Sequence, residues 1–108
     1  MKEELIQVIN IKIAITLNLL LETSKKFSSI NKSTEEIIES YNEIALEADI
    51  RKATVSDAFN AKAITGPKST TVFLIVQAMG YSLSDFAEIY DKLTNKEVEK
   101  FKKARNIY

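Results

Sequence analysis

Very few residues that interrupt a helix occur in this sequence: two glycines and a single proline in 108 residues. Sheet proteins of this length need many turns, and their turns draw on glycine and proline, so the scarcity favours an all-α fold. The length predicts one domain with a modest core. The apolar share of 45% and the charged share of 28% are typical of a folded chain and argue against wholesale disorder.

Start and stop signals divide the chain into about five to six helices. A serine or threonine followed three residues later by an acidic residue marks a helix start, while glycine or proline marks an end or a loop. Gly66 and Pro67 predict a loop, and Gly80 predicts a helix end. The predicted helices cover residues 3–24, 34–48, 51–61, 69–79, 82–93 and 94–106, with a loop at 28–33.

The segment after this loop admits two interpretations. Ser33 with Glu36 marks one helix start, and Ser40 with Glu43 repeats the same signature further along. The segment is therefore either one helix or a short helix followed by a second that begins at Tyr41. We favour the break at Tyr41.

The first predicted helix, residues 3–24, is the most apolar part of the chain. Isoleucines alternate at positions 9, 11, 13 and 15 as in a strand, but the segment is too long for one strand, and its apolar residues also keep helical spacing. They extend around more than one face, so the helix is either core or part of a homodimer interface. Polar residues interrupt it, which argues against a membrane span or signal peptide and predicts a cytoplasmic protein without membrane contact. These interruptions are Gln7, Asn10, Lys12 and Asn18.

The sequence contains neither cysteine nor histidine. Their absence excludes disulfides, zinc sites and nearly all acid–base machinery that depends on histidine. No base is spaced to activate a serine nucleophile, and no glycine-rich loop is present to hold a phosphate. We therefore predict that the protein is not an enzyme, with no catalytic residues, no cofactor and no metal. Only magnesium-dependent carboxylate chemistry stays open.

Charge is segregated along the chain, although the formal net charge is zero. Every charged residue between 33 and 49 is acidic, whereas basic residues dominate 50–69 and 92–105. The acidic residues at 35, 39, 43 and 47 fall four apart, which predicts an acidic ladder if the helix is continuous. Such a ladder is a solvated face or a surface for a basic partner or neighbouring subunit. The distribution is compatible with a nucleic-acid partner despite the neutral sum.

The central stretch, residues 43–62, has the features of a helix-turn-helix, in which two helices lock together around a tight turn. Ala45 is the small residue at the close approach, and Asp49 falls where the turn requires a left-handed backbone. The residues that lock the pair are Ile44, Ala48, Ile50, Val55 and Ala58. The outward face of the second helix is then left to Arg51, Lys52, Ala53, Thr54, Ser56, Asp57 and Asn60. Its small side chains allow entry into the major groove, and its basic start attracts guanine edges or phosphates.

The segments IALEADIRKATVSDAFNAK and GPKSTTVFLIVQAMGYSLSDF together resemble the phage repressor and Cro type of helix-turn-helix, also called the xenobiotic-response-element family. The resemblance covers residues 40–86. It implies a compact helical bundle of the lambda-repressor-like type, here with an extended N-terminal helix, that binds double-stranded operator DNA as a homodimer. A single domain, 1–108, would then comprise an N-terminal helix and loop (1–32), the helix-turn-helix core (40–86) and a C-terminal helix (94–106).

The resemblance also implies roles for individual residues. Those at base-reading positions are Lys52, Ala53, Thr54 and Asp57, with Arg51 as a base or phosphate contact and Ser56 on the same face. Those in the phosphate-binding segment are Asn60, Lys62, Lys68 and Ser69. Ser40 and Tyr41 match the start of the first motif helix, which abuts the DNA backbone. Asp57 is acidic at its position, where it either accepts from cytosine N4 or repels the backbone.

Three functions remain after these arguments. The favoured one is a sequence-specific DNA-binding transcriptional regulator. The second is an antitoxin of the same fold, whose toxin would bind the apolar first helix or the acidic ladder. The third is a protein-interaction module that has lost DNA binding, consistent with the neutral net charge.

Overall fold

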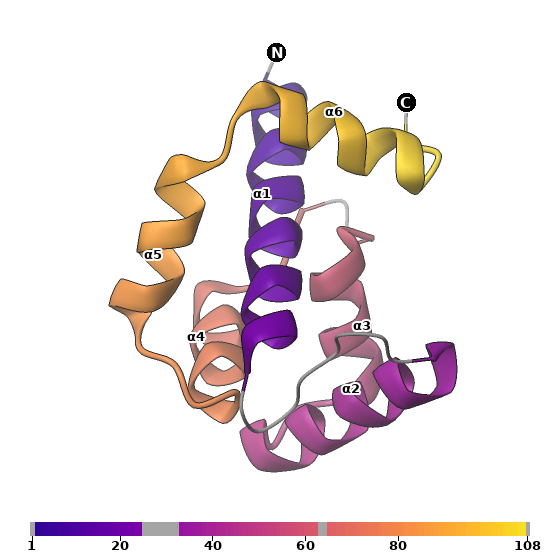
Figure 1. Ribbon diagram of the computed structural model, residues 1–108, viewed down its shortest axis with the longest axis vertical. Helices are drawn as coiled ribbons and strands as arrows, with labels where there is room; N and C mark the ends of the chain where they lie inside the picture. The colour runs from indigo at the N-terminus through magenta and orange to yellow at the C-terminus, as the bar shows by residue number, and fades with distance from the viewer. Residues whose placement is uncertain (1, 25–32, 63–64, 108) are drawn as a thin grey trace.

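The computed structural model describes residues 2–24, 33–62 and 65–107, and within these ranges it contains six helices and no strand (Figure 1). The prediction of an all-α fold is therefore confirmed, whereas the predicted loop at 28–33 lies, except for Ser33, outside the described residues. The helices are α1 (Lys2–Thr23), α2 (Thr34–Ala48), α3 (Lys52–Asn60), α4 (Ser69–Ala78), α5 (Leu83–Lys92) and α6 (Asn95–Ala104).

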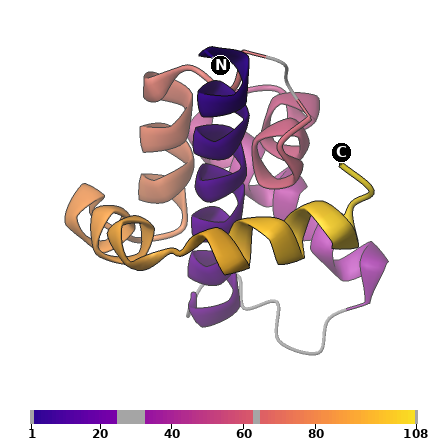
Figure 2. The same ribbon diagram turned by 90° about the horizontal axis from the view of Figure 1, so that it is seen from above.

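α1 is the central helix of the bundle. Three other helices, α3, α5 and α6, pack against it (Figures 1 and 2). Because they approach from different sides, side chains around much of α1 are fully buried, which explains why its apolar residues are not confined to one face. The buried apolar residues of α1 are Ile11, Ala14, Leu17, Leu20 and Leu21. By length and composition alone residues 4–23 would suffice to span a membrane; in this fold the five buried apolar side chains of this segment form part of the core, whereas Leu5 and Ile9 are exposed.

Side-chain caps set the helix starts that the sequence predicts. At α2 the amide of Glu36 donates to the Ser33 hydroxyl over 3.2 Å, and the Ser33 amide donates back to the Glu36 carboxylate. Ser82 and Asp85 form the same reciprocal pair at the start of α5. These capping boxes are confirmed, and they satisfy amides that have no partner inside the helix.

α2 is one continuous helix, and the predicted break at Tyr41 is wrong. The Ser40 hydroxyl donates to the carbonyl of Glu36 one turn earlier, over 3.1 Å, instead of capping a new helix. Ile37, Tyr41 and Ile44 form an apolar row at helical spacing that packs in the core. Burial of this row keeps the segment helical through the second start signal.

α6 adds a second, smaller core on α1 and also contacts α3. Val98 and Phe101 are buried against α1. Just beyond α6, Nε of Arg105 donates to Oδ1 of Asn60, the last residue of α3, over 3.2 Å. The Arg105 guanidinium also lies 4.2 Å from the centroid of the Phe101 ring. α6 is therefore connected to both α1 and the end of α3.

Candidate nucleic-acid interface

α3 has one buried face and one outward face. Val55, Ala58 and Phe59 recur at helical spacing, and all three are buried. The outward face consists of the residues predicted for it: Arg51, Lys52 and Ala53 are exposed, while Thr54, Ser56, Asp57 and Asn60 are partly exposed. The buried face fixes the helix in the bundle, and the short side chains on the other face allow another molecule to approach closely.

The turn between α2 and α3 has the left-handed backbone conformation that was predicted for Asp49. Asp49 adopts the left-handed conformation, with φ 56° and ψ 46°, which an aspartate tolerates better than most residues. The next amide, that of Ile50, donates back to the Ala45 carbonyl over 3.0 Å and satisfies the end of α2. Between the helices the rings of Tyr41 and Phe59 pack with their centroids 4.8 Å apart. These contacts set the direction in which α3 leaves the turn.

The starts of α3 and α4 share an unusual feature. Their N-cap residues are Arg51 and Lys68, and neither side chain makes a capping hydrogen bond. No acidic residue occupies the first turn of either helix. The amides at a helix start carry partial positive charge and favour anions. Both starts thus combine positively polarised amides with a cationic side chain, an arrangement that suits a phosphate group.

A groove of about 470 Å³ lies between these two helix starts. Arg51, Thr54 and Asp57 line it from α3. Lys68 and Thr71 line it from the other side, together with residues 66 and 67 of the preceding loop. The groove therefore contains two cationic side chains, two hydroxyls and one carboxylate. The cations and hydroxyls can bind phosphate oxygens, and the carboxylate can accept from a hydrogen-bond donor.

Gly66 holds the loop against α1. Its φ is +81°, and a side chain at this position would collide with the buried side chain of Asn10. Only glycine combines this backbone conformation with so close an approach. The contact positions the loop that forms one wall of the groove.

Comparison with known proteins gives no match for this chain, whether to a protein-family model, a curated protein or a solved structure. Among the described residues, no group of three or more acidic side chains is placed to hold a metal ion. Function is therefore inferred from the groove, the outward face of α3 and the charges around them.

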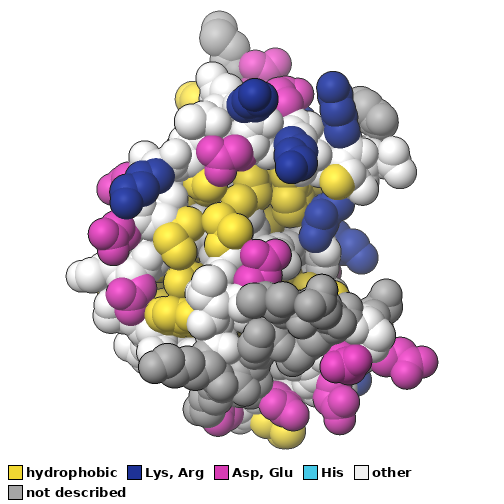
Figure 3. All heavy atoms as spheres, in the orientation of Figure 1, with side chains coloured by type: hydrophobic (Ala, Val, Ile, Leu, Met, Phe, Trp, Pro, Cys, Tyr) yellow, Lys and Arg dark blue, Asp and Glu magenta, His cyan; other side chains and the backbone are white. Residues whose placement is uncertain are grey.

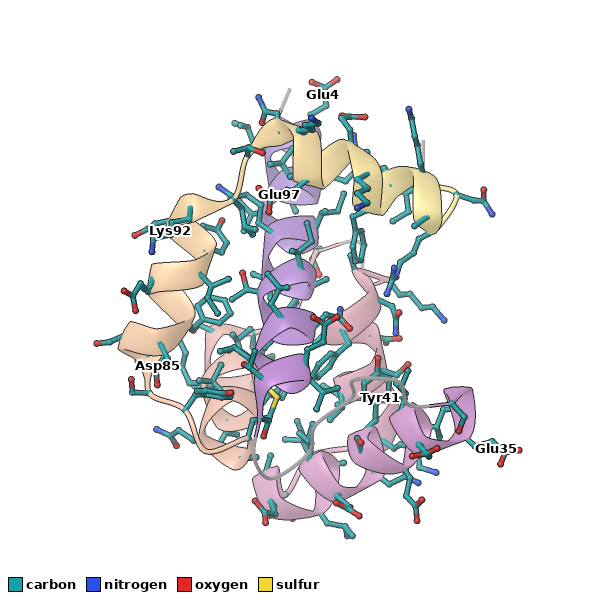
Figure 4. The ribbon with its side chains drawn as sticks, in the orientation of Figure 1. Glu4, Glu35, Tyr41, Asp85, Lys92 and Glu97 are labelled. Atoms are coloured by element: carbon teal, nitrogen blue, oxygen red, sulfur yellow. The ribbon has the colours of Figure 1, made fainter. Side chains whose placement is uncertain are left out.

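Two of the predicted backbone-contacting residues are not available to DNA. Ser40 is only 3% exposed and Tyr41 only 7%. Figure 4 shows Tyr41 on the inner side of α2, whereas Glu35 projects away from the body. The assignment of Ser40 and Tyr41 to the DNA interface is wrong because α2 continues through them, so they lie within a helix and not at its start.

Asn60 is engaged inside the protein, in contrast to its predicted phosphate-binding role. Its Nδ2 donates to the Ser56 carbonyl over 2.8 Å, and its Oδ1 accepts from Arg105. Burial raises the pKa of Tyr41 above its usual value of 10.0, and the Asn60 hydrogen bond and the Arg105 charge only partly oppose this shift. Asn60 thus joins α2, α3 and α6. No pattern in the sequence predicted that Arg105 contacts Asn60, because the two residues are 45 positions apart in the chain.

The remaining predicted phosphate contacts are on the surface. Lys62, Lys68 and Ser69 are all exposed. Lys68 and Ser69 stand at the start of α4, next to the groove, whereas Lys62 follows α3 at its opposite end. The groove therefore brings together Arg51, Thr54, Asp57 and Lys68, and leaves Lys62 apart from them.

Opposite charges also gather on different parts of the surface (Figure 3). α2 carries exposed acidic side chains along one continuous face, at positions 35, 36, 39, 43 and 47. α6 carries exposed lysines at 96, 100 and 103. The acidic ladder expected for a continuous helix is thus present. α4 and the start of α2 lie on opposite sides of α1 in Figure 2, and no residue of α2 lines the groove.

Proposed function

We propose that the protein is a sequence-specific DNA-binding regulator that reads the major groove with α3. The observation that carries this proposal is the pairing of two uncapped, cationic helix starts around the groove between α3 and α4. Phosphates bound there would position α3, and its outward side chains would meet base edges. This is the function expected from the resemblance to repressors of the lambda-repressor-like fold.

The side chains of α3 fit this task. Ala53, Thr54 and Ser56 are short, so the helix axis can approach the floor of the major groove closely. Arg51 and Lys52 are exposed at the end of the helix that faces into the DNA in this type of complex. The buried face of α3 is held by α1 and α2, so the outward face is presented rigidly.

A homodimer is part of the proposal, because regulators of this kind bind two half-sites about one helical turn apart. An apolar groove of about 340 Å³ lies between α1, α4 and α5. Ile9 and Phe73 line it and are 46% and 41% exposed. A second copy would bury these side chains and leave the outward face of α3 free for DNA.

The proposal is tested by selecting bound duplexes from a random library. The wild-type protein should enrich a two-fold symmetric sequence, and Arg51→Ala/Lys52→Ala should not. The matched control is Lys96→Ala/Lys100→Ala, which removes the same charge from the exposed face of α6 and should enrich the wild-type sequence. Absence of any enriched sequence with the wild-type protein would overturn the proposal, as would equal loss in both double variants.

A second candidate is a protein-binding module, including an antitoxin that holds a basic toxin. The acidic face of α2 favours it, since this face also exposes two apolar side chains, Ile38 at 47% and Leu46 at 81%. Acidic residues around apolar anchors suit a basic, amphipathic partner. A gene for a small toxin next to this one would distinguish an antitoxin from a regulator. Failure of the duplex selection would favour a binding module without DNA recognition.

A further inference from the structure

Asp57 is the one carboxylate that the groove and the outward face of α3 share. Its side chain lines the groove with Arg51 and Thr54, which lie on the same side of the helix. Its neighbours on the outward face, Ala53 and Ser56, are short, so the carboxylate stands clear of them. Among the described residues, none forms an ion pair or hydrogen bond with this carboxylate.

A carboxylate at this position imposes a chemical requirement on any DNA that binds. An ionised Asp57 can only accept hydrogen bonds, and it is repelled by phosphates. In the major groove, guanine and thymine present acceptors, O6 with N7 and O4 respectively, whereas cytosine N4 and adenine N6 are donors. Guanine or thymine opposite Asp57 would leave two acceptors facing each other without water, which is unfavourable.

Cytosine satisfies this requirement better than adenine. Adenine places its N7 acceptor next to the N6 donor, so the second carboxylate oxygen of Asp57 would face a lone pair. Cytosine presents its N4 amino group without a neighbouring acceptor on that edge. The negative charge of Asp57 thus favours cytosine over the other three bases.

We propose that Asp57 is a specificity-determining residue that selects cytosine at the base pair facing the middle of α3 and excludes guanine and thymine. This inference rests on the proposed DNA binding. Arg51 and Lys68, in the same groove, offset the repulsion between the carboxylate and the DNA backbone by binding phosphates.

The test repeats the duplex selection with Asp57→Asn and with Glu88→Gln as the matched control. Glu88 is an exposed glutamate on α5 that does not line the apolar groove, so its variant removes the same charge away from α3 and from the proposed dimer contact. In the wild-type sequence logo one cytosine per half-site should depend on Asp57. Asp57→Asn should reduce discrimination at that position about tenfold or more and shift the preference to adenine, because an amide pairs with N6 and N7. Glu88→Gln should leave the logo unchanged.

The outcomes separate this inference from the proposed function. If the wild-type protein enriches no sequence, DNA binding itself fails and the inference fails with it. If the wild-type protein enriches a sequence and Asp57→Asn enriches the same one, DNA binding stands and only the role of Asp57 is refuted. The same refutation follows if Glu88→Gln shifts the logo as strongly as Asp57→Asn does.

Discussion

α2 and α3 are consecutive helices, yet their first turns differ in both capping and charge. α2 starts with a reciprocal pair between Ser33 and Glu36 and has two acidic residues in its first turn. α3 starts at Arg51 with no side-chain cap and no acidic residue in its first turn. The first arrangement complements the helix dipole, and the second opposes it.

The difference shows where this chain gives up local stability. A side-chain cap at an N-terminus contributes about 1 kcal/mol to stability, and α3 lacks this contribution. The amides at its start are instead left for an external anion, which would bind beside the cationic side chain. Helices with poor intrinsic starts depend on packing, and α3 has that packing through its buried face.

The largest expected effect comes from removing this packing. Phe59→Ala deletes a fully buried ring that packs against Tyr41, and we expect the free energy of unfolding to fall by about 3–5 kcal/mol. Urea denaturation followed by circular dichroism measures the change. Ser56→Ala, on the partly exposed side of the same helix, should stay within about 0.5 kcal/mol of wild type. A loss below about 1 kcal/mol for Phe59→Ala would show that α3 is held by other contacts.

Giving α3 the kind of start that α2 has should move stability and DNA binding in opposite directions. Arg51→Asp adds a capping carboxylate, so we expect the free energy of unfolding to rise by about 1 kcal/mol. Affinity for the selected duplex should fall by about 1–3 kcal/mol, because a cation at the groove is replaced by an anion. Thermal melting and fluorescence anisotropy measure the two quantities. If stability and DNA affinity both rose or both fell, the uncapped start of α3 would not be explained by anion binding.

The converse change at α2 should affect stability alone. Ser33→Ala removes the hydroxyl that accepts from Glu36, and the free energy of unfolding should fall by about 1 kcal/mol. DNA affinity should not change, because neither Ser33 nor any residue of α2 lines the groove. Denaturation and anisotropy on the same preparation check both expectations. If Ser33→Ala lowered DNA affinity under conditions in which the variant is fully folded, the start of α2 would belong to the DNA interface.

The smallest expected effect concerns the start of α4. Lys68→Ala removes one proposed phosphate contact, so the slope of log affinity against log salt should become shallower by about one, with base preference unchanged. Lys100→Ala, on the exposed face of α6, is the control and should leave the slope as it is. Affinity titrations over a range of salt concentrations give both slopes. A changed base preference for Lys68→Ala would contradict a purely electrostatic role.

Much of the fold was predictable because its signals are local. The boxes at Ser33 and Ser82 each act within one turn, and the left-handed turn at Asp49 depends on a single residue. The same local signal at Ser40 led to the wrong break, because it says nothing about the apolar row that packs on the core around it. A cap signal has an effect only where tertiary packing lets a helix begin.

The candidate site was predictable on α3 and less so around it. The spacing of Val55 and Ala58 predicted the buried face, and hence the outward one, and the structure adds Phe59 to the buried face. The hydrogen bond between Arg105 and Asn60, in contrast, joins residues from distant parts of the chain, and no pattern of sequence spacing predicts such a contact. Assignments based on resemblance failed at Ser40 and Tyr41 because this chain extends the helix that the family begins there.

The position of α1 has a consequence for synthesis on the ribosome. α1 precedes in the chain all three helices that cover it, and the last of these ends at Ala104. At typical rates of translation, the interval between the completion of α1 and that of α6 is on the order of ten seconds. During this time a helix apolar enough to enter a bilayer is exposed to chaperones and membrane-targeting factors. α3 is the first of the three covering helices to be completed, so its contact with α1 is the earliest that can shorten this exposure.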